Sequence, residues 1–306
     1  MLLAAETEKT IMKAPKAMNQ QTLRQKLRDY RRHPFSFILL LLVSLATVVT
    51  VGILLFLIGY ILIMGIPNLS PDLFAWEYNS ENVSMMPAIV NTLMMTLLSL
   101  LIAVPLGIFA AIYLVEYAGR GNKLVSLVRI TAETLSGIPS IVYGLFGYLL
   151  FVVACGFGYS LLAGALTLSI MILPLIMRTT EEALKAVPDT YREGSFGLGA
   201  GRLRTVFRIV LPSAMPGILS GVILGIGRIV GETAALIYTS GTVAGIPNSL
   251  LKSGRTLSVH MYALWNEGLN GEEAYATAVV LLIMVVGINA LSGFVAKKVG
   301  TRESNG

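Results

Sequence analysis

Long apolar segments alternate with short polar ones along the chain, and this pattern predicts an all-α integral membrane protein with six transmembrane helices. A helix needs about 20 residues to cross a bilayer. Residues 134–177 hold no charge over 44 positions, so we expect two spans there, divided at Cys155–Tyr159. Glycines and Pro139 in the third span predict a kink. The apolar segments are 36–66, 87–115, 134–177, 216–239 and 274–296.

Composition supports a membrane protein and gives no sign of a metal site or of an ATP-hydrolysing site on this chain. The 306 residues are 55% hydrophobic and 13% charged, and the mean hydropathy is +0.75. These values exclude an ordinary soluble domain. Cys155 is the single cysteine, His33 and His260 are far apart, and no metal-ligand cluster is visible. No G-x-x-x-x-G-K-[ST] motif occurs, so any ATP hydrolysis must come from another chain.

The distribution of basic residues predicts the orientation. Of the 23 Lys and Arg residues, 20 lie in the segments that six spans would leave on one side. Only Lys252 and Arg255 lie in the opposite loops, and Arg228 falls within a span. Basic residues favour the cytosolic side of a membrane. We therefore expect both termini in the cytosol, and we attribute the net charge of +6 to topology rather than to nucleic-acid binding.

Two short tails flank the predicted membrane domain of residues 35–298. Residues 1–34 carry eight basic residues, with Glu6 and Glu8 and no short apolar core, so a cleavable signal peptide is not expected. Leu23, Leu27 and Tyr30 fit one face of a surface helix, and a solvated tail is the open alternative. Residues 299–306 form the C-terminal tail.

The longest polar interruption, residues 178–211, contains a spaced motif. Glu193 precedes Gly199 by six positions, and nine residues then separate Gly199 from Ile209-x-Leu211-Pro212. This spacing resembles the coupling loop of ABC importer permeases, with Gly194 and Ser195 where the family usually has two alanines. The resemblance implies a type I importer fold (MetI-like). It also implies that this loop contacts an ATPase, both through the motif and through nearby apolar side chains. The alternative is that the apolar side chains pack onto the membrane helices. The residues concerned are Tyr191, Glu193, Gly194, Ser195, Phe196, Leu198, Gly199, Ile209, Leu211 and Pro212.

Arg228 and Glu232 are the charges inside the fifth predicted span. A charge at the bilayer centre costs at least about 2.5–3.5 kcal/mol, so such residues are usually functional. Four positions apart on one helix, the two would share a face with Gly217, Gly221 and Gly225. A buried arginine suits an oxyanion because its planar fork donates several hydrogen bonds. Either the pair lines a substrate pathway, or it is an ion pair that locks two helices.

A narrower resemblance lies in SGIPSIVYGLFG (136–147) and GRIVGETAALIYTSG (227–241). Both look like the phosphate-specific branch of the family, the PstA-type inner-membrane permease. The likeness implies a bacterial inner-membrane subunit that forms half of a phosphate pathway and has no catalysis of its own. It implies a second homologous permease, an ATPase dimer that binds ATP and Mg, and an external phosphate-binding protein as partners. The family's membrane arginines map onto Arg228 and onto Arg178.

Other functions stay open at this stage. A permease for another oxyanion, such as sulfate or molybdate, would share the charge pattern. A secondary anion carrier is disfavoured by the coupling motif and by the lack of inverted repeats. An intramembrane enzyme is disfavoured because no nucleophile–base pair or metal set is visible, and we expect no cofactor on this chain.

Overall fold

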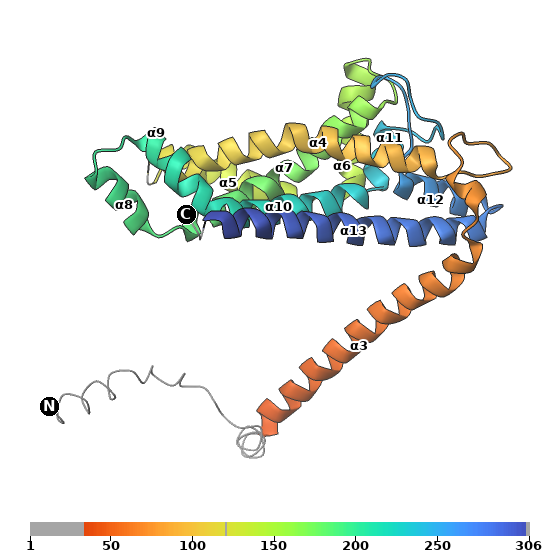
Figure 1. Cartoon of the computed structure of the whole chain (residues 1–306), viewed down its shortest axis with the longest axis horizontal. Coiled ribbons are helices and arrows are strands. Elements are labelled where there is room, and N and C mark those ends of the chain that lie inside the picture. The colour runs from red at the N-terminus through yellow and green to blue at the C-terminus, as the bar shows by residue number, and fades with distance from the viewer. Residues whose placement is uncertain (1–33, 120, 304–306) are drawn as a thin grey trace. The chain divides into compact units, whose positions relative to one another are not determined.

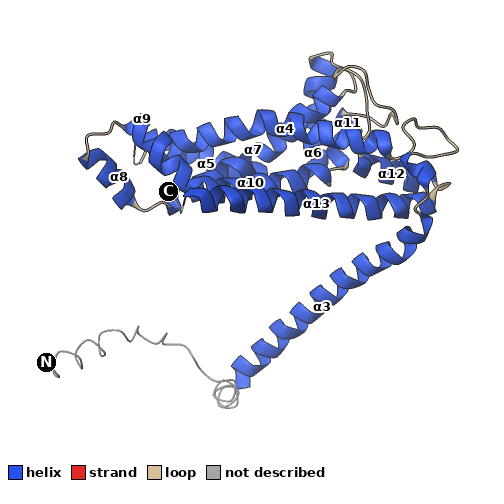
Figure 2. Ribbon diagram, viewed as in Figure 1, coloured by secondary structure: helices blue, strands red, loops and turns tan. Residues whose placement is uncertain are grey.

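The computed structural model describes residues 34–119 and 121–303 of the chain. Everything assigned there is helix or turn, as the sequence predicts (Figure 2). The basic tail predicted for residues 1–34 and the last tail residues lie almost entirely outside the described part. The chain divides into two units, residues 1–60 and 61–306.

The first long helix, α3 (Pro34–Gly65), matches the first predicted span. Its apolar side chains up to Phe56 are all exposed. Phe56 and Tyr60 stack on each other within it, with ring centroids 6.2 Å apart. An uncharged helix of 32 residues with such a surface suits a lipid or a protein environment rather than water.

The second unit is a bundle of long helices (Figure 1). Helix α4 (Met86–Ile112) packs against α7 (Leu161–Ala186), which packs against α10 (Leu211–Val230), and α13 (Gly271–Glu303) lies along α10. Two apolar clusters fill the bundle, one around Met95, Leu168 and Ile172 and the other around Ile112, Leu184 and Val210.

Small residues let α7 and α10 approach closely. A Cβ added to Gly217 would lie 2.7 Å from the Cβ of Ala183. One added to Gly221 would overlap the Thr179 side chain. Side chains there would push the helices apart, as expected for membrane helices that pack on glycine.

The third predicted span is a bent pair of helices. Helix α5 (Lys123–Ser136) and the helical segment of α6 (Ser140–Gly147) and η4 (Tyr148–Ala154) meet at 105°. The bend lies at Gly137-Ile138-Pro139, which confirms the kink. Proline disfavours a helical residue before it, and this explains the break. Cys155 ends the segment, and Gly156 and Gly158 adopt positive φ in the predicted turn.

In the part of the chain that the structure describes, five helices are long and apolar enough to cross a membrane. The number of spans is six if the bent pair counts as one span. The six-span prediction is confirmed on that basis. The fifth span differs from expectation. A continuous helical run of α9 (Arg202–Thr205), η5 (Val206–Val210) and α10 ends at Val230, and α11 (Ala234–Thr239) follows separately.

The two ends of the bundle carry different short helices. Helix α8 (Asp189–Gly197) lies with α9 at one end, and α12 (Leu257–Glu267) lies at the other (Figure 1). The segment with η1 (Ile66–Asn68) and η2 (Pro71–Phe74) also belongs to the α12 end, where Leu73 packs with Met85 and Leu257. Candidate functional residues gather at both ends.

Candidate functional site

Helix α8 is a short surface helix with defined ends. Pro188 precedes its first residue and has no N–H to continue the ladder of α7, so the chain turns out of that helix. At the other end, Gly199 has φ +83°, a conformation that glycine adopts without strain. The glycine of the motif therefore makes the turn that its position predicts.

The apolar side chains of the motif face outward. Leu198 is 91% exposed, and Tyr191 and Phe196 are about half exposed. Tyr191 and Leu198 line an open groove of about 580 Å³ beside α8. Such positions fit contact with another protein better than packing onto the membrane helices. The other residues of the groove are Thr190, Gly194, Ser195, Gly199, Ala200, Arg204, Arg208 and Ile209.

The small residues of the motif have separate positions. Glu193 and Gly194 are exposed, and a Cβ on Gly194 would meet nothing within 4 Å. Ser195 is buried, and its hydroxyl lies 2.8 Å from that of Thr205. Ser195 therefore ties α8 to α9, and its small size serves a contact within the chain.

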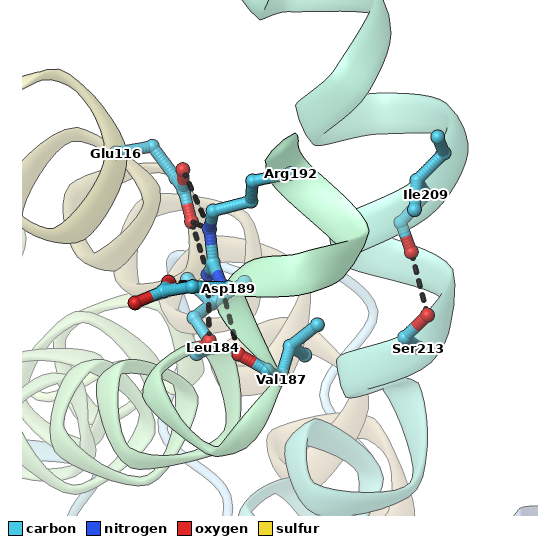
Figure 3. A network of polar contacts seen from close by, with 7 residues as sticks. All are labelled: Glu116, Leu184, Val187, Asp189, Arg192, Ile209 and Ser213. Carbon is cyan, nitrogen blue, oxygen red and sulfur yellow. Dashed lines mark hydrogen bonds and ion pairs between the residues drawn. The ribbon is translucent and has the colours of Figure 1, made fainter. Parts of the chain in front are cut away.

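The second half of the motif shapes the start of α10. Ile209, Leu211 and Pro212 are half-buried, and the Ser213 hydroxyl donates to the Ile209 carbonyl at 2.7 Å (Figure 3). Pro212 lacks an N–H, so the preceding helix loses one rung of its ladder. The π-helical turn η5 lies directly before it, as expected where such a ladder is interrupted.

A buried ion pair attaches α8 to the bundle. Arg192 lies on α8, and its guanidinium donates to Glu116 at 2.7 Å from Nη2 and 3.2 Å from Nε (Figure 3). The same group donates to the carbonyls of Leu184 and Val187, and to Asp189 at 3.2 Å. Glu116 belongs to the π-helical turn η3 (Tyr113–Tyr117) at the end of α4. The side chains of Arg192 and Glu116 are only 15% and 8% exposed.

This network has the geometry of a strong ion pair. Two donors on one guanidinium edge meet one carboxylate, and the remaining donors meet carbonyls at the end of α7. A buried pair holds only when its hydrogen bonds are satisfied in this way. Arg192 therefore fixes α8 to both α4 and α7.

Charged side chains also surround the α8 end of α7. Arg178 is exposed and pairs with Glu182 at 3.1 Å. Glu181 is buried and accepts from Arg129 at 2.7 Å and from Lys185. A pocket of about 210 Å³ lies among these five residues and Glu133. Three cations and three carboxylates balance here, so Arg178 sits in a mixed field rather than a purely basic one.

Arg228 and Glu232 do not share a helix, and the expectation that they do is wrong. Helix α10 ends at Val230, two residues before Glu232. The Glu232 carboxylate accepts from the Ala235 backbone N–H at 3.0 Å and so caps α11. Among residues 34–119 and 121–303, no ion pair joins Arg228 to Glu232. Arg228 instead lies near enough to Tyr143 for its charge to act on that side chain.

A second polar cluster at the α12 end was missed by the sequence analysis. Arg255 is 4% exposed, and its guanidinium carbon lies 4.7 Å from the centre of the Tyr78 ring. His260 is fully buried, and its ring meets Tyr78 edge-on at 6.2 Å. Burial and the Arg255 charge lower the pKa of His260 to about 3. We name Tyr78, Arg255 and His260 the α12-end cluster.

These missed residues left only weak signals in the sequence. Glu116 directly follows a predicted span, and Arg192 lies inside the motif. Their pairing joins positions 76 apart, which no local pattern reveals. Arg255 is one of two basic residues in the predicted outer loops, and this departure from the charge bias was its only sign.

Comparison with known proteins places this geometry in a family. Residues 103–304 match the family model described as binding-protein-dependent transport system inner membrane component. A Bacillus subtilis relative, "Probable ABC transporter permease protein YqgI", is 33% identical over 264 residues, or 80% of this chain and 90% of that protein. The Mycobacterium tuberculosis protein "Phosphate transport system permease protein PstA 1" is 39% identical over 222 residues, or 71% of each chain.

Solved structures share the fold. A chain of the bacterial alginate ABC transporter, in complex with a pentasaccharide-bound periplasmic protein, matches with a TM-score of 0.64 at 15% identity. That match covers 89% of this chain and 97% of the other. A chain of the MetNI methionine ABC transporter matches with a TM-score of 0.56 at 22% identity, over 70% and 93%. The importer-permease fold expected from the coupling motif is thereby confirmed.

The Arg192–Glu116 pair yields a first prediction. Glu116→Gln leaves the Arg192 charge buried without its carboxylate, and breaking a buried pair costs about 3–5 kcal/mol. We expect local opening of α8 to increase by about 100-fold, measured as tryptic cleavage at Arg202 and Arg204 in the purified chain. Glu182→Gln is the matched control, because its exposed pair contributes about 0–1 kcal/mol. Equal cleavage rates in the two variants would contradict the assigned role.

His260 yields a second prediction. Its pKa is about 3 in the folded chain and about 6.5 when unfolded, so the unfolded state takes up the proton first as the pH falls. Stability is therefore retained above about pH 6.5 and lost between about pH 6.5 and 3. The thermal midpoint of the wild type should fall further between pH 7.5 and 5.0 than that of His260→Gln. His33→Gln, the control, should follow the wild type; parallel curves for all three would refute a buried neutral His260.

Proposed function

Because the chain belongs to the family of binding-protein-dependent transport system inner membrane components, we propose that it is the transmembrane permease subunit of an ATP-driven phosphate importer. The observation that supports phosphate as the substrate is the 39% identity to a mycobacterial phosphate permease over 71% of both chains. In this proposal the chain forms half of a translocation pathway. A second homologous permease forms the other half.

Helix α8 is the proposed contact with the ATPase subunits. Its exposed side chains, above all Leu198, and the groove beside them offer an apolar surface at the end of the bundle. Arg204 and Arg208 add positive charge at the rim of that groove. The Arg192–Glu116 pair would pass a movement of α8 to α4, and the carbonyl contacts would pass it to α7.

The division of labour follows from the residues of this chain. It has no phosphate-binding loop for ATP, so ATP and Mg would bind the partner ATPase dimer, and this subunit would hold no cofactor of its own. An external phosphate-binding protein would deliver the substrate. The bias of 20 basic residues to one side supports a cytosolic location for α8 and both termini, which would leave α12 at the outer face.

Two arginines are proposed for the pathway. Arg228 lies near the end of α10 and is only partly buried, so its fork is available to an oxyanion. Arg178 lies at the α8 end of the bundle, where it and Glu182 both line the pocket of about 210 Å³. Neighbouring carboxylates would weaken anion binding there, and a pathway must bind weakly enough to release its cargo.

The coupling assignment gives a direct prediction. Leu198→Asp puts a charge into an apolar contact, so the ATPase should no longer co-purify and ATP-dependent uptake should fall to background. Leu269→Asp is the matched control, because that leucine is 85% exposed and lies in the loop after α12. Equal ATPase binding by the two variants would rule out the α8 contact.

The same assay tests the substrate. Proteoliposomes with the complete wild-type complex should take up radiolabelled phosphate only with ATP and the binding protein. Excess sulfate should leave that uptake unchanged. Competition by sulfate at equal concentration would point to a general oxyanion permease, and uptake driven by an ion gradient alone would point to a secondary carrier.

A further inference from the structure

The α12-end cluster contains a buried cation with open hydrogen-bonding capacity. Arg255 is 4% exposed, and neither its Nε nor its Nη2 has a hydrogen-bond partner in the described part of the chain. These two groups form one edge of the guanidinium. That edge is a fork that matches two oxygens of a carboxylate or a phosphate. Because no group in the described part of the chain pairs with this fork, it is open to an external anion.

Arg255 has no ion-pair partner among residues 34–119 and 121–303, where no carboxylate lies within ion-pair distance of it. Its guanidinium instead lies over the Tyr78 ring, at 4.7 Å from the ring centre. Arg255 also lies two residues before the first residue of α12, where the helix dipole is positive. A buried cation is costly without an anionic partner, and the helix end increases the need for one.

The backbone holds Arg255 in this place. Its N–H donates to the Val243 carbonyl at 2.9 Å, and its carbonyl accepts from the Asn91 side chain at 3.1 Å. Asn91 also donates to the Gly245 carbonyl at 3.1 Å, and Gly245 borders a pocket of about 400 Å³. The guanidinium is thus positioned by α4 and the preceding loop rather than left free on a surface.

His260 adds a neutral donor and acceptor beside the same ring. It is fully buried, and neither ring nitrogen has a partner in hydrogen-bond geometry, although the Val83 backbone lies close. Its pKa of about 3 keeps the imidazole neutral near pH 7. A neutral imidazole carries one N–H donor and one bare nitrogen that accepts. The cluster therefore offers several donors and one acceptor.

We propose that Arg255, His260 and Tyr78 form a binding site for phosphate at the end of the bundle opposite α8. This inference rests on the proposed phosphate transport. It adds a second binding site, which phosphate would reach before Arg228. The Arg255 fork binds two phosphate oxygens, and His260 binds the others. Tyr78 contacts Arg255 and His260 and also lines the pocket of about 400 Å³, so we place the entrance to the site at that pocket.

The neutral histidine gives this site a means to select phosphate over sulfate. Phosphate at neutral pH keeps at least one O–H, whereas sulfate has none. The bare nitrogen of His260 accepts that O–H from phosphate and faces an unprotonated oxygen in sulfate. Sites that hydrogen-bond one substrate group reject the analogue that lacks it, because a buried polar group is then unpaired.

The pocket lining moderates the affinity. Glu77 borders it together with Trp76 and Tyr78. A carboxylate there repels a bound anion and assists its release toward Arg228, as a transport pathway requires.

The experiment measures equilibrium binding of radiolabelled phosphate to the purified complex with its ATPase, without the binding protein. Arg255→Gln should weaken binding by about 10- to 100-fold, the loss expected for a charge-assisted fork. Lys252→Gln is the matched control, because it removes one positive charge from an exposed position of the same loop. Equal binding by the Arg255 and Lys252 variants would overturn the proposal.

A second comparison separates a binding role from a structural one. His260→Leu should bring phosphate and sulfate affinities together, whereas His260→Gln keeps an acceptor and should retain most of the preference. A merely structural histidine would change both anions equally, and that result would also overturn the proposal. If Arg255→Gln fails to assemble, Arg255→Lys takes its place, because lysine keeps the charge and loses the fork. Unchanged phosphate affinity in that variant would overturn the proposal.

Transport by the wild type distinguishes a failure of the proposed Arg255 site from a failure of the proposed phosphate transport. Phosphate uptake by wild-type proteoliposomes without Arg255-dependent binding would remove the site and leave the proposed function intact. Arg255-dependent binding of sulfate, with no phosphate uptake, would remove the proposed function and the assigned preference together.

Discussion

The contact on which this molecule's proposed work depends is the buried ion pair between Arg192 and Glu116. It is the point where a short surface helix meets the membrane bundle. The Arg192 donors meet acceptors on three elements: Glu116 in η3, two carbonyls at the end of α7, and Asp189 in the first turn of α8. Because buried charges tolerate few alternative arrangements, α8 has one defined position against α4 and α7.

The rest of the bundle is suited to carry a movement onward. Glycines on α10 meet Ala183 and Thr179 of α7 at close range, and both helices share one apolar cluster with α4. Close-packed interiors have low compressibility and move as units. A displacement of α8 would therefore reach the α12 end without passing through a flexible loop. The α12-end cluster lies where that movement would arrive.

The sequence predicted the apolar framework well, whereas the contact of the coupling motif with an ATPase stays a prediction. Helix ends at Pro139 and at Cys155 follow from local backbone chemistry, and the turn at Gly199 follows from the freedom of glycine. The break at Val230 was missed because Gly231, Glu232 and Thr233 fit a helical pattern equally well. Contacts with other segments end the helix there. The Glu232 side chain caps α11, and the Ser258 hydroxyl donates to the Glu232 carbonyl from a distant segment. The burial of Arg192 and Arg255 was equally invisible, since each depends on partners far along the chain.

The central claim is that α8 and α4 move as one body, and a distance measurement between them tests it most directly. Spin labels at positions 197 and 101, both exposed in this chain, would be placed in a Cys155→Ser background of the complete complex; an added side chain at Gly197 meets nothing within 4 Å. Pulsed electron paramagnetic resonance should then give a single narrow distance that stays the same with and without ATP. A distance that shifts by several ångströms between nucleotide states would show that α8 moves independently of α4 and would contradict this account.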